Sequence, residues 1–230
     1  MIAAAAFLLL FQAEPAAAPQ PQGSPRFEQC LAQIEADPSA AYESAMAWAN
    51  EARALEAYHC AALALIDMGR PEQAARRLES LALAAEGQSP GVQISLYSQA
   101  GHAWILANEP SRARSAFTRV IVGLAPASPQ MPDALIDRAI AYGEEGDHRM
   151  AEEDLSRALD LRPNDALALR LRALSRMRQN AFDLALADAE AALRLEPNNV
   201  DAALALGHVR ESQRIGRPVD EDGGEPEPAN

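Results

Sequence analysis

The 230-residue sequence contains no lysine, so all 20 of its basic residues are arginine. Together with 33 acidic residues they give a formal net charge of −13. A chain of this charge repels a phosphate backbone, and no nucleic-acid partner is expected. Aromatic residues make up only 5% of the chain, fewer than a β-sandwich or barrel would need. Because alanine is abundant and has the highest helix propensity, the composition favours an all-α fold.

Residue groupings that carry out catalysis or hold a metal are also missing. The four histidines have no second ligand at a spacing typical of zinc sites, and the 12 glycines form no phosphate-binding loop. We therefore expect no catalytic residue, no metal and no cofactor, and a binding protein rather than an enzyme. The histidines are interpreted as groove or surface residues. The acidic run Glu152, Glu153 and Asp154 is interpreted as a solvated helix face.

The two ends of the chain differ in composition from its middle. Residues 2–11 form an apolar run too short for a bilayer, which needs about 20 residues, but suited to a secretory signal. We predict a signal peptide over residues 1–13 and a periplasmic or secreted protein with no stable membrane span after cleavage. The alternative is an apolar N-terminus on a cytoplasmic protein. Residues 14–26, with four prolines, predict an extended linker, and the acidic residues 217–230 predict a disordered tail.

Between these ends the sequence repeats itself with a period close to 34 residues. Residues 151–165 and 185–199 are identical at seven of fifteen positions after a shift of 34, and Pro163 and Pro197 are among the identities. A fixed period of this size indicates stacked supersecondary units. A single helical hairpin cannot bury its own apolar face, so each unit must pack against its neighbours.

The units share one internal layout. A first helix places two small residues between two large ones, a turn follows, and the second helix has an alanine four residues before a bulky residue. The clearest copy consists of Tyr97, Ala100, Gly101, Trp104, Ala113 and Phe117. In three further copies the first anchor and the second-helix alanine are also 16 residues apart: Tyr58 and Ala74, Leu135 and Ala151, Leu169 and Ala185.

This layout resembles the tetratricopeptide repeat over about residues 27–216. The resemblance implies an all-α, right-handed superhelical solenoid of antiparallel helix pairs, closed by a capping helix over about residues 200–215. Together with the predicted signal, it suggests an exported bacterial member of that family.

Turn residues support these unit boundaries. Pro38, Pro71 and Pro110 are expected at the first position of second helices, where the missing N–H would have no partner in any case. Asp147 and Asn180 are expected to cap the second helices of the last two units.

The resemblance also implies a function. In similar solenoids the first helices of the pairs line a concave groove that binds proteins or peptides. The residues implied for this groove are Glu56, His59, Leu63, His102, Ile136, Ile140, Glu144, Arg170, Leu174, Arg178, Leu204 and His208. We expect a scaffold that binds a protein or peptide there. An alternative is a structural component of a cell-envelope complex that binds by its convex face or edges.

The two cysteines fall in the first helices of consecutive units. The resemblance implies that such helices pack side by side, so Cys30 and Cys60 can meet. In an oxidising compartment they would form a disulfide that closes about 30 residues. The alternatives are two unpaired core cysteines, or a redox or enzyme-associated role centred on the pair.

Overall fold

Helices make up nearly all of the chain that the computed structural model describes, which comprises residues 24–85, 87 and 90–219. In chain order they are α1 (Pro25–Ala36), α2 (Pro38–Ala52), α3 (Leu55–Asp67), α4 (Pro71–Ala84), α5 (Pro90–Leu106), α6 (Pro110–Gly123), α7 (Met131–Glu144), α8 (His148–Leu161), α9 (Ala166–Arg178), α10 (Phe182–Leu195) and α11 (Val200–Ile215). These residues contain no strand, so the predicted all-α fold is confirmed. None of these helices is long and apolar enough to cross a membrane. The predicted signal peptide lies outside the described residues, as does most of the predicted linker and tail.

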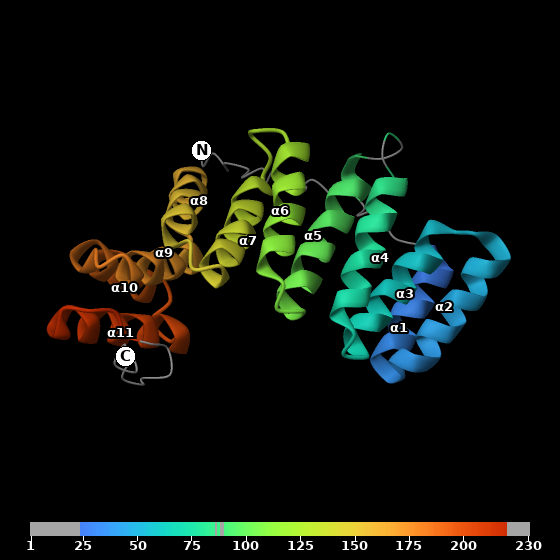
Figure 1. Ribbon diagram of the computed structural model, residues 1–230, viewed down its shortest axis with the longest axis horizontal. Helices are drawn as coiled ribbons and strands as arrows, with labels where there is room; N and C mark the ends of the chain where they lie inside the picture. The colour runs from blue at the N-terminus through green and yellow to red at the C-terminus, as the bar shows by residue number, and fades with distance from the viewer. Residues whose placement is uncertain (1–23, 86, 88–89, 220–230) are drawn as a thin grey trace, which may run out of the picture.

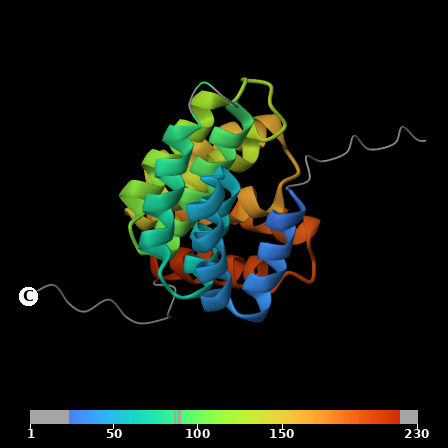
Figure 2. The ribbon, with the colours of Figure 1, turned by 90° about the vertical axis from the view of Figure 1, so that its right-hand side faces the viewer.

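The helices are stacked in chain order from α1 at one end to α11 at the other (Figure 1). Seen from the α1–α2 end, the later units lie behind the first (Figure 2). Extensive packing joins only helices that are neighbours or next neighbours in the described chain. This is the packing of a solenoid, in which each unit is stabilised by the units on either side. The predicted helical solenoid is therefore confirmed.

Proline begins the second helix in each of the first three units, as predicted. Pro38, Pro71 and Pro110 stand at the start of α2, α4 and α6, where proline gives up no hydrogen bond within the helix. Asp147 caps α8, because its carboxylate accepts a hydrogen bond from the backbone N–H of Met150 at 3.1 Å. These residues fix where the second helices start.

Asn180 has a different role from the predicted cap. The N-cap of α10 is Ala181, and Asn180 precedes it in a left-handed conformation with φ of 63°. Gly69, Asn108 and Gly146 occupy the corresponding turns with φ of 70°, 57° and 79°. Glycine and asparagine adopt this conformation more readily than other residues. The prediction for Asn180 was wrong because this turn position requires a positive φ rather than a capping side chain.

The folded region extends slightly beyond the predicted residues 27–216. At the start, α1 begins at Pro25. At the end, Gly216 closes α11 in a left-handed conformation, and the chain turns back so that Val219 packs against a buried cluster of α9, α10 and α11. The backbone N–H of Val219 donates a hydrogen bond to Ser212 Oγ at 3.0 Å. The residues just after Gly216 therefore belong to the last unit.

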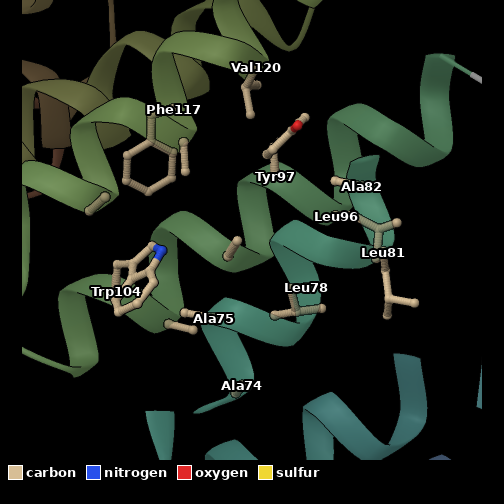
Figure 3. Close-up of a cluster of buried hydrophobic side chains, with 14 of the residues drawn as sticks. Ala74, Ala75, Leu78, Leu81, Ala82, Leu96, Tyr97, Trp104, Phe117 and Val120 are labelled. Carbon is tan, nitrogen blue, oxygen red and sulfur yellow. The ribbon is translucent and has the colours of Figure 1, made fainter. Parts of the chain in front are cut away.

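The core of the central units combines a few large side chains with many alanines (Figure 3). Trp104 of α5 and Phe117 of α6 are completely buried. The Trp104 indole N–H donates a hydrogen bond to Glu79 at 3.1 Å, so its polar atom is satisfied. Small residues let the paired helices approach closely, and the rings fill the remaining space.

Gly101 lies at one of these close approaches, and replacing it with leucine is expected to destabilise the fold. A Cβ atom at this position would lie 2.5–2.8 Å from carbons of the Phe117 ring. We expect Gly101→Leu to lower the free energy of unfolding by about 1 to 3 kcal/mol, measured by urea denaturation. The matched control is Gly207→Ala in α11, where an added Cβ meets nothing within 4 Å. The control should be neutral or more stable by up to about 1 kcal/mol, and wild-type stability of Gly101→Leu would contradict this packing.

Candidate binding groove

A hollow of about 360 Å³ opens between α7 and α9, the first helices of two successive units. It is lined by Ala139, Ile140, Gly143, Glu144, His148, Leu155, Leu171, Leu174, Ser175 and Arg178. Four of the predicted groove residues, Ile140, Glu144, Leu174 and Arg178, are therefore brought together. Aliphatic side chains provide much of the lining, with an acid on α7 and a base on α9.

The other predicted groove residues do not share one environment. His102 and Leu204 are exposed. The half-buried ones are Glu56, His59, Leu63, Arg170 and His208. Ile136 is only 3% exposed and belongs to the buried cluster of α7, α8 and α9. Its placement on the groove surface does not hold, because neighbouring helices cover the first turns of α7.

His59 is half-buried between neighbouring units and is not freely exposed in the groove. Its ring stacks on Phe27 of α1, with centroids 5.1 Å apart. Its Nε2 lies 2.6 Å from Oε1 of Gln99 in α5, so one side chain connects α1, α3 and α5. Burial lowers the pKa of His59, which favours the neutral ring.

His102 forms an ion pair between α5 and α7. Its Nε2 lies 3.1 Å from Oδ1 of Asp137, and its ring packs at 63° to the Phe117 ring with centroids 5.2 Å apart. The hydrogen bond to Asp137 raises the pKa of His102 above its ordinary value. The protonated ring therefore strengthens the contact between these two helices.

This pair predicts a pH dependence with a defined sign. Because the folded pKa of His102 is raised, its stabilising contribution is fully present below the unfolded value of about 6.5 and is lost as pH rises through the folded pKa. Asp137→Asn should lower the pKa of His102, followed by NMR titration of the imidazole protons. Glu153→Gln, an exposed change on α8, is the control and should leave it unaltered. An unchanged pKa in Asp137→Asn would contradict the pairing.

Two buried aspartates tie the first helix to the second in the last two complete units. Asp154 accepts two hydrogen bonds from Arg138, at 2.7 and 2.8 Å. Asp188 accepts two from Arg172, both at 2.8 Å. The aspartates are only 1% and 6% exposed. Bidentate, charge-assisted pairs of this kind hold both partners in a fixed geometry.

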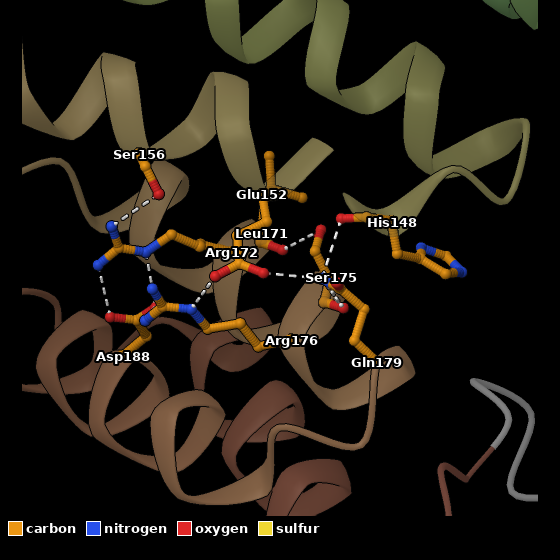
Figure 4. A network of polar contacts seen from close by, with 9 residues as sticks. All are labelled: His148, Glu152, Ser156, Leu171, Arg172, Ser175, Arg176, Gln179 and Asp188. Atoms are coloured by element: carbon orange, nitrogen blue, oxygen red, sulfur yellow. Dashed lines mark hydrogen bonds and ion pairs between the residues drawn. The ribbon is translucent and has the colours of Figure 1, made fainter. Parts of the chain in front are cut away.

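The second pair belongs to a larger network beside the hollow (Figure 4). Arg176 lies 2.7 Å from Glu152 of α8 and 2.8 Å from Asp188 of α10. Gln179 donates hydrogen bonds to Glu152 at 2.8 Å and to the His148 carbonyl at 3.2 Å. Because His148 also lines the hollow, the network holds one of its walls in place.

This network corrects the interpretation of the acidic run as a solvated face. Glu153 is exposed, but Asp154 is buried and paired and Glu152 is half-buried and paired. Sequence reasoning missed these pairs, although a signal was present. Asp154 and Asp188 are 34 residues apart, and so are their arginine partners. A charge pair repeated at the unit period indicates a structural contact within each unit.

Comparison with known proteins identifies the family. A tetratricopeptide repeat profile matches residues 61–132, 136–200 and 171–215. No curated protein matches the sequence.

Solved structures show the same architecture at low sequence identity. MamA 41-end from Desulfovibrio magneticus RS-1 is 17% identical, with a TM-score of 0.63, over 76% of this chain and 93% of that one. A crystal structure of MamA is 19% identical, with a TM-score of 0.61, over 72% and 92%. The first TPR domain of human RPAP3 is 23% identical, with a TM-score of 0.51, over 56% and 97%. These likenesses show the fold alone. Because the family profile covers more than half of the sequence, the chain belongs to the tetratricopeptide repeat family.

Proposed function

We propose that this protein is a scaffold that binds an extended segment of another protein in the groove formed by its first helices. The observation that carries the proposal is the hollow between α7 and α9. Its volume of about 360 Å³ falls within the range of pockets that hold small ligands or side chains, roughly 300 to 1,000 Å³. We propose a binding role and no catalytic one.

The lining of the hollow suits a peptide with an apolar side chain. Ile140, Leu171 and Leu174 offer an apolar surface on which that side chain would be removed from water. Glu144 and Arg178 stand at the same hollow with opposite charges. Charged groups at such a site favour one orientation of a peptide and discriminate against others.

We further propose that the protein acts outside the cytoplasm, in the periplasm or as a secreted protein. The predicted signal peptide motivates this, and so does the disulfide between Cys30 and Cys60, whose Cα atoms are 6.4 Å apart. Disulfides persist mainly in oxidising compartments. Cys60 is completely buried and Cys30 is 6% exposed, which supports a structural bridge over a redox role.

Selection from a displayed peptide library, followed by affinity measurements on the selected peptides, tests the binding proposal. Leu174→Asp and Glu144→Arg should each weaken binding about tenfold or more, equivalent to about 1.4 kcal/mol. The matched controls are Leu184→Asp and Glu153→Arg, exposed positions on the second helices α10 and α8. Binding that responds only to the control substitutions would favour the alternative, a component of a cell-envelope complex that binds by its convex face.

A further inference from the structure

Gly143 of α7 lines the hollow at a repeat position where the other matched units have a large apolar residue. It lies eight residues after the first anchor of its unit, Leu135. At the same distance from their own anchors, the other three units have Ile66, Ile105 and Met177. The two isoleucines are half-buried and pack against the central core, and Met177 is completely buried. Three units thus fill with a side chain the space that Gly143 leaves open.

Neither the backbone nor a close neighbour requires glycine at this position. Gly143 lies within α7 and does not have a positive φ. A Cβ atom added to it would meet nothing within 4 Å, whereas one added to Gly101 would collide with the ring of Phe117. Glycine inside a helix is less stable than alanine by about 1 kcal/mol. The structural effect that distinguishes Gly143 is the hollow that it helps to form.

The deep part of the hollow suits an apolar group. Ala139 and Leu155, which are 3% and 1% exposed, form part of its lining. Ser175 also lines it, but its Oγ already donates a hydrogen bond to the Leu171 carbonyl at 3.0 Å. Within the described part of the chain, no buried side-chain nitrogen or oxygen lacks a partner. An aliphatic side chain would therefore be removed from water there without leaving a polar atom unpaired.

The charge at the edge of the hollow favours a basic neighbour for that side chain. Glu144 is exposed and forms no hydrogen bond or ion pair with any residue that the structure describes. Arg178, on α9, already has an interaction partner. Burial and the charge of Arg178 lower the pKa of His148, so its neutral ring adds no positive charge. In a chain with a net charge of −13, a cation beside Glu144 is attracted.

We infer that the hollow binds one aliphatic side chain of the size of leucine, isoleucine or methionine, presented beside a basic residue by an extended segment of the partner. The partner's side chain takes the place that Ile66, Ile105 and Met177 fill in the other units. Gly143 is then the residue that determines specificity. This inference rests on the proposed binding role of the hollow and adds the chemistry of the segment that it takes.

Isoamylamine is a suitable probe, because it joins a branched aliphatic group to a cation. Added to the full chain at low ionic strength, it should cause saturable NMR shifts in the methyl groups of Ile140 and Leu174, which line the hollow. Isoamyl alcohol has the same shape without the charge. It should bind the same methyl groups about two- to fivefold more weakly, as expected for the loss of an exposed ion pair. Glu144→Gln should remove this difference.

Filling the space from within the protein tests the role of Gly143. Gly143→Ile should weaken the binding of isoamylamine, and of peptides selected from the library, by about tenfold or more. The matched control is Gly207→Ile in α11, another helical glycine whose added Cβ would meet nothing within 4 Å. It should bind like wild type. If Gly143→Ile does not fold, Gly143→Ala serves in its place and should show a smaller loss in the same direction.

Three outcomes would overturn the inference: no saturable shifts in wild type, equal affinities of wild type and the position-143 variant, or equal affinities for the amine and the alcohol. The probe experiment contains no peptide. If the probe binds as expected but the library yields no peptide, the chemistry of the hollow stands and the proposed scaffold function fails. If selected peptides lack an aliphatic residue and bind Gly143→Ile as tightly as wild type, the scaffold function stands and this inference fails.

Discussion

Replacing Asp154 with alanine is expected to lower the free energy of unfolding by about 3 kcal/mol or more. Asp154 is 1% exposed and neutralises Arg138 through two hydrogen bonds, and the Arg138 side chain is itself only 13% exposed. The hydrogen bonds to Asp154 raise the pKa of Arg138, and the variant loses them, but a guanidinium stays protonated at all ordinary pH values, so Arg138 remains charged. Its remaining contacts would be the hydroxyl of Thr118, at 3.3 Å, and the ring of Tyr142, whose centroid lies 5.8 Å away. The loss comes from an uncompensated, largely buried charge.

The double variant Arg138→Met/Asp154→Leu distinguishes the stability that the ion pair contributes from the cost of leaving one of its charges buried without a partner. Because both charges are removed and the space is filled, it should recover most or all of the lost stability. Glu153→Ala changes an exposed acid on the same helix and should stay within about 0.5 kcal/mol of wild type. Urea denaturation of the four proteins measures these differences. A single variant as stable as the double one would show that Arg138 reaches solvent without its partner.

The neighbouring unit supports this expectation. Ala100 and Ala116 stand where the next unit has Arg138 and Asp154, at the same distances from the unit anchors, and both alanines are buried. One solenoid therefore uses an apolar pair in α5 and α6 and an ionic pair in α7 and α8. Both residues of the pair differ between these two units, as expected for residues in contact.

Much of the fold could be predicted from the sequence because its determinants are local and repeated. The offset of 16 residues from Tyr97 to Ala113 recurs in three other units, and the prolines mark helix starts. Gly101 is one of the two small residues in the first helix of the clearest repeat copy, and the structure places it against Phe117. Asn180 was misinterpreted because capping and a left-handed turn both favour asparagine.

The groove was less predictable because its shape depends on packing between units. Ile140 and Leu174 were proposed as groove residues from their position in the first helix of each unit, and both line the hollow. Ile136 was predicted to line the groove from the same spacing, but neighbouring helices cover it. Helical spacing gives the face on which a side chain lies, but the depth of that side chain depends on how closely successive units approach. The hollow itself depends on the approach of α7 to α9, which no single unit encodes.

Removing the disulfide is the second substitution from which we expect a large effect. Cys30 of α1 and Cys60 of α3 are 30 residues apart, and loop-closure entropy for a loop of this length is worth about 3 to 4 kcal/mol. Cys30→Ala/Cys60→Ala should therefore lose about this much stability. Wild-type protein in reductant should lose a similar amount, and reductant should not change the variant further.

The loss should be concentrated at one end of the solenoid. The first unit has a neighbour on one side only, so it depends more than central units on contacts across that single interface. Without the bridge, α1 would still be joined to α3 by the stacking of Phe27 on His59 and by the hydrogen bond from the Ser24 backbone N–H to Glu56 at 3.2 Å. These contacts are weaker than a covalent bond, so α1 and α2 should open first. Amide hydrogen exchange should show faster exchange in these two helices, with protection in α5 to α10 retained at the same denaturant concentration. Equal loss of protection along the whole chain would mean that the units unfold together and that the bridge stabilises the solenoid globally.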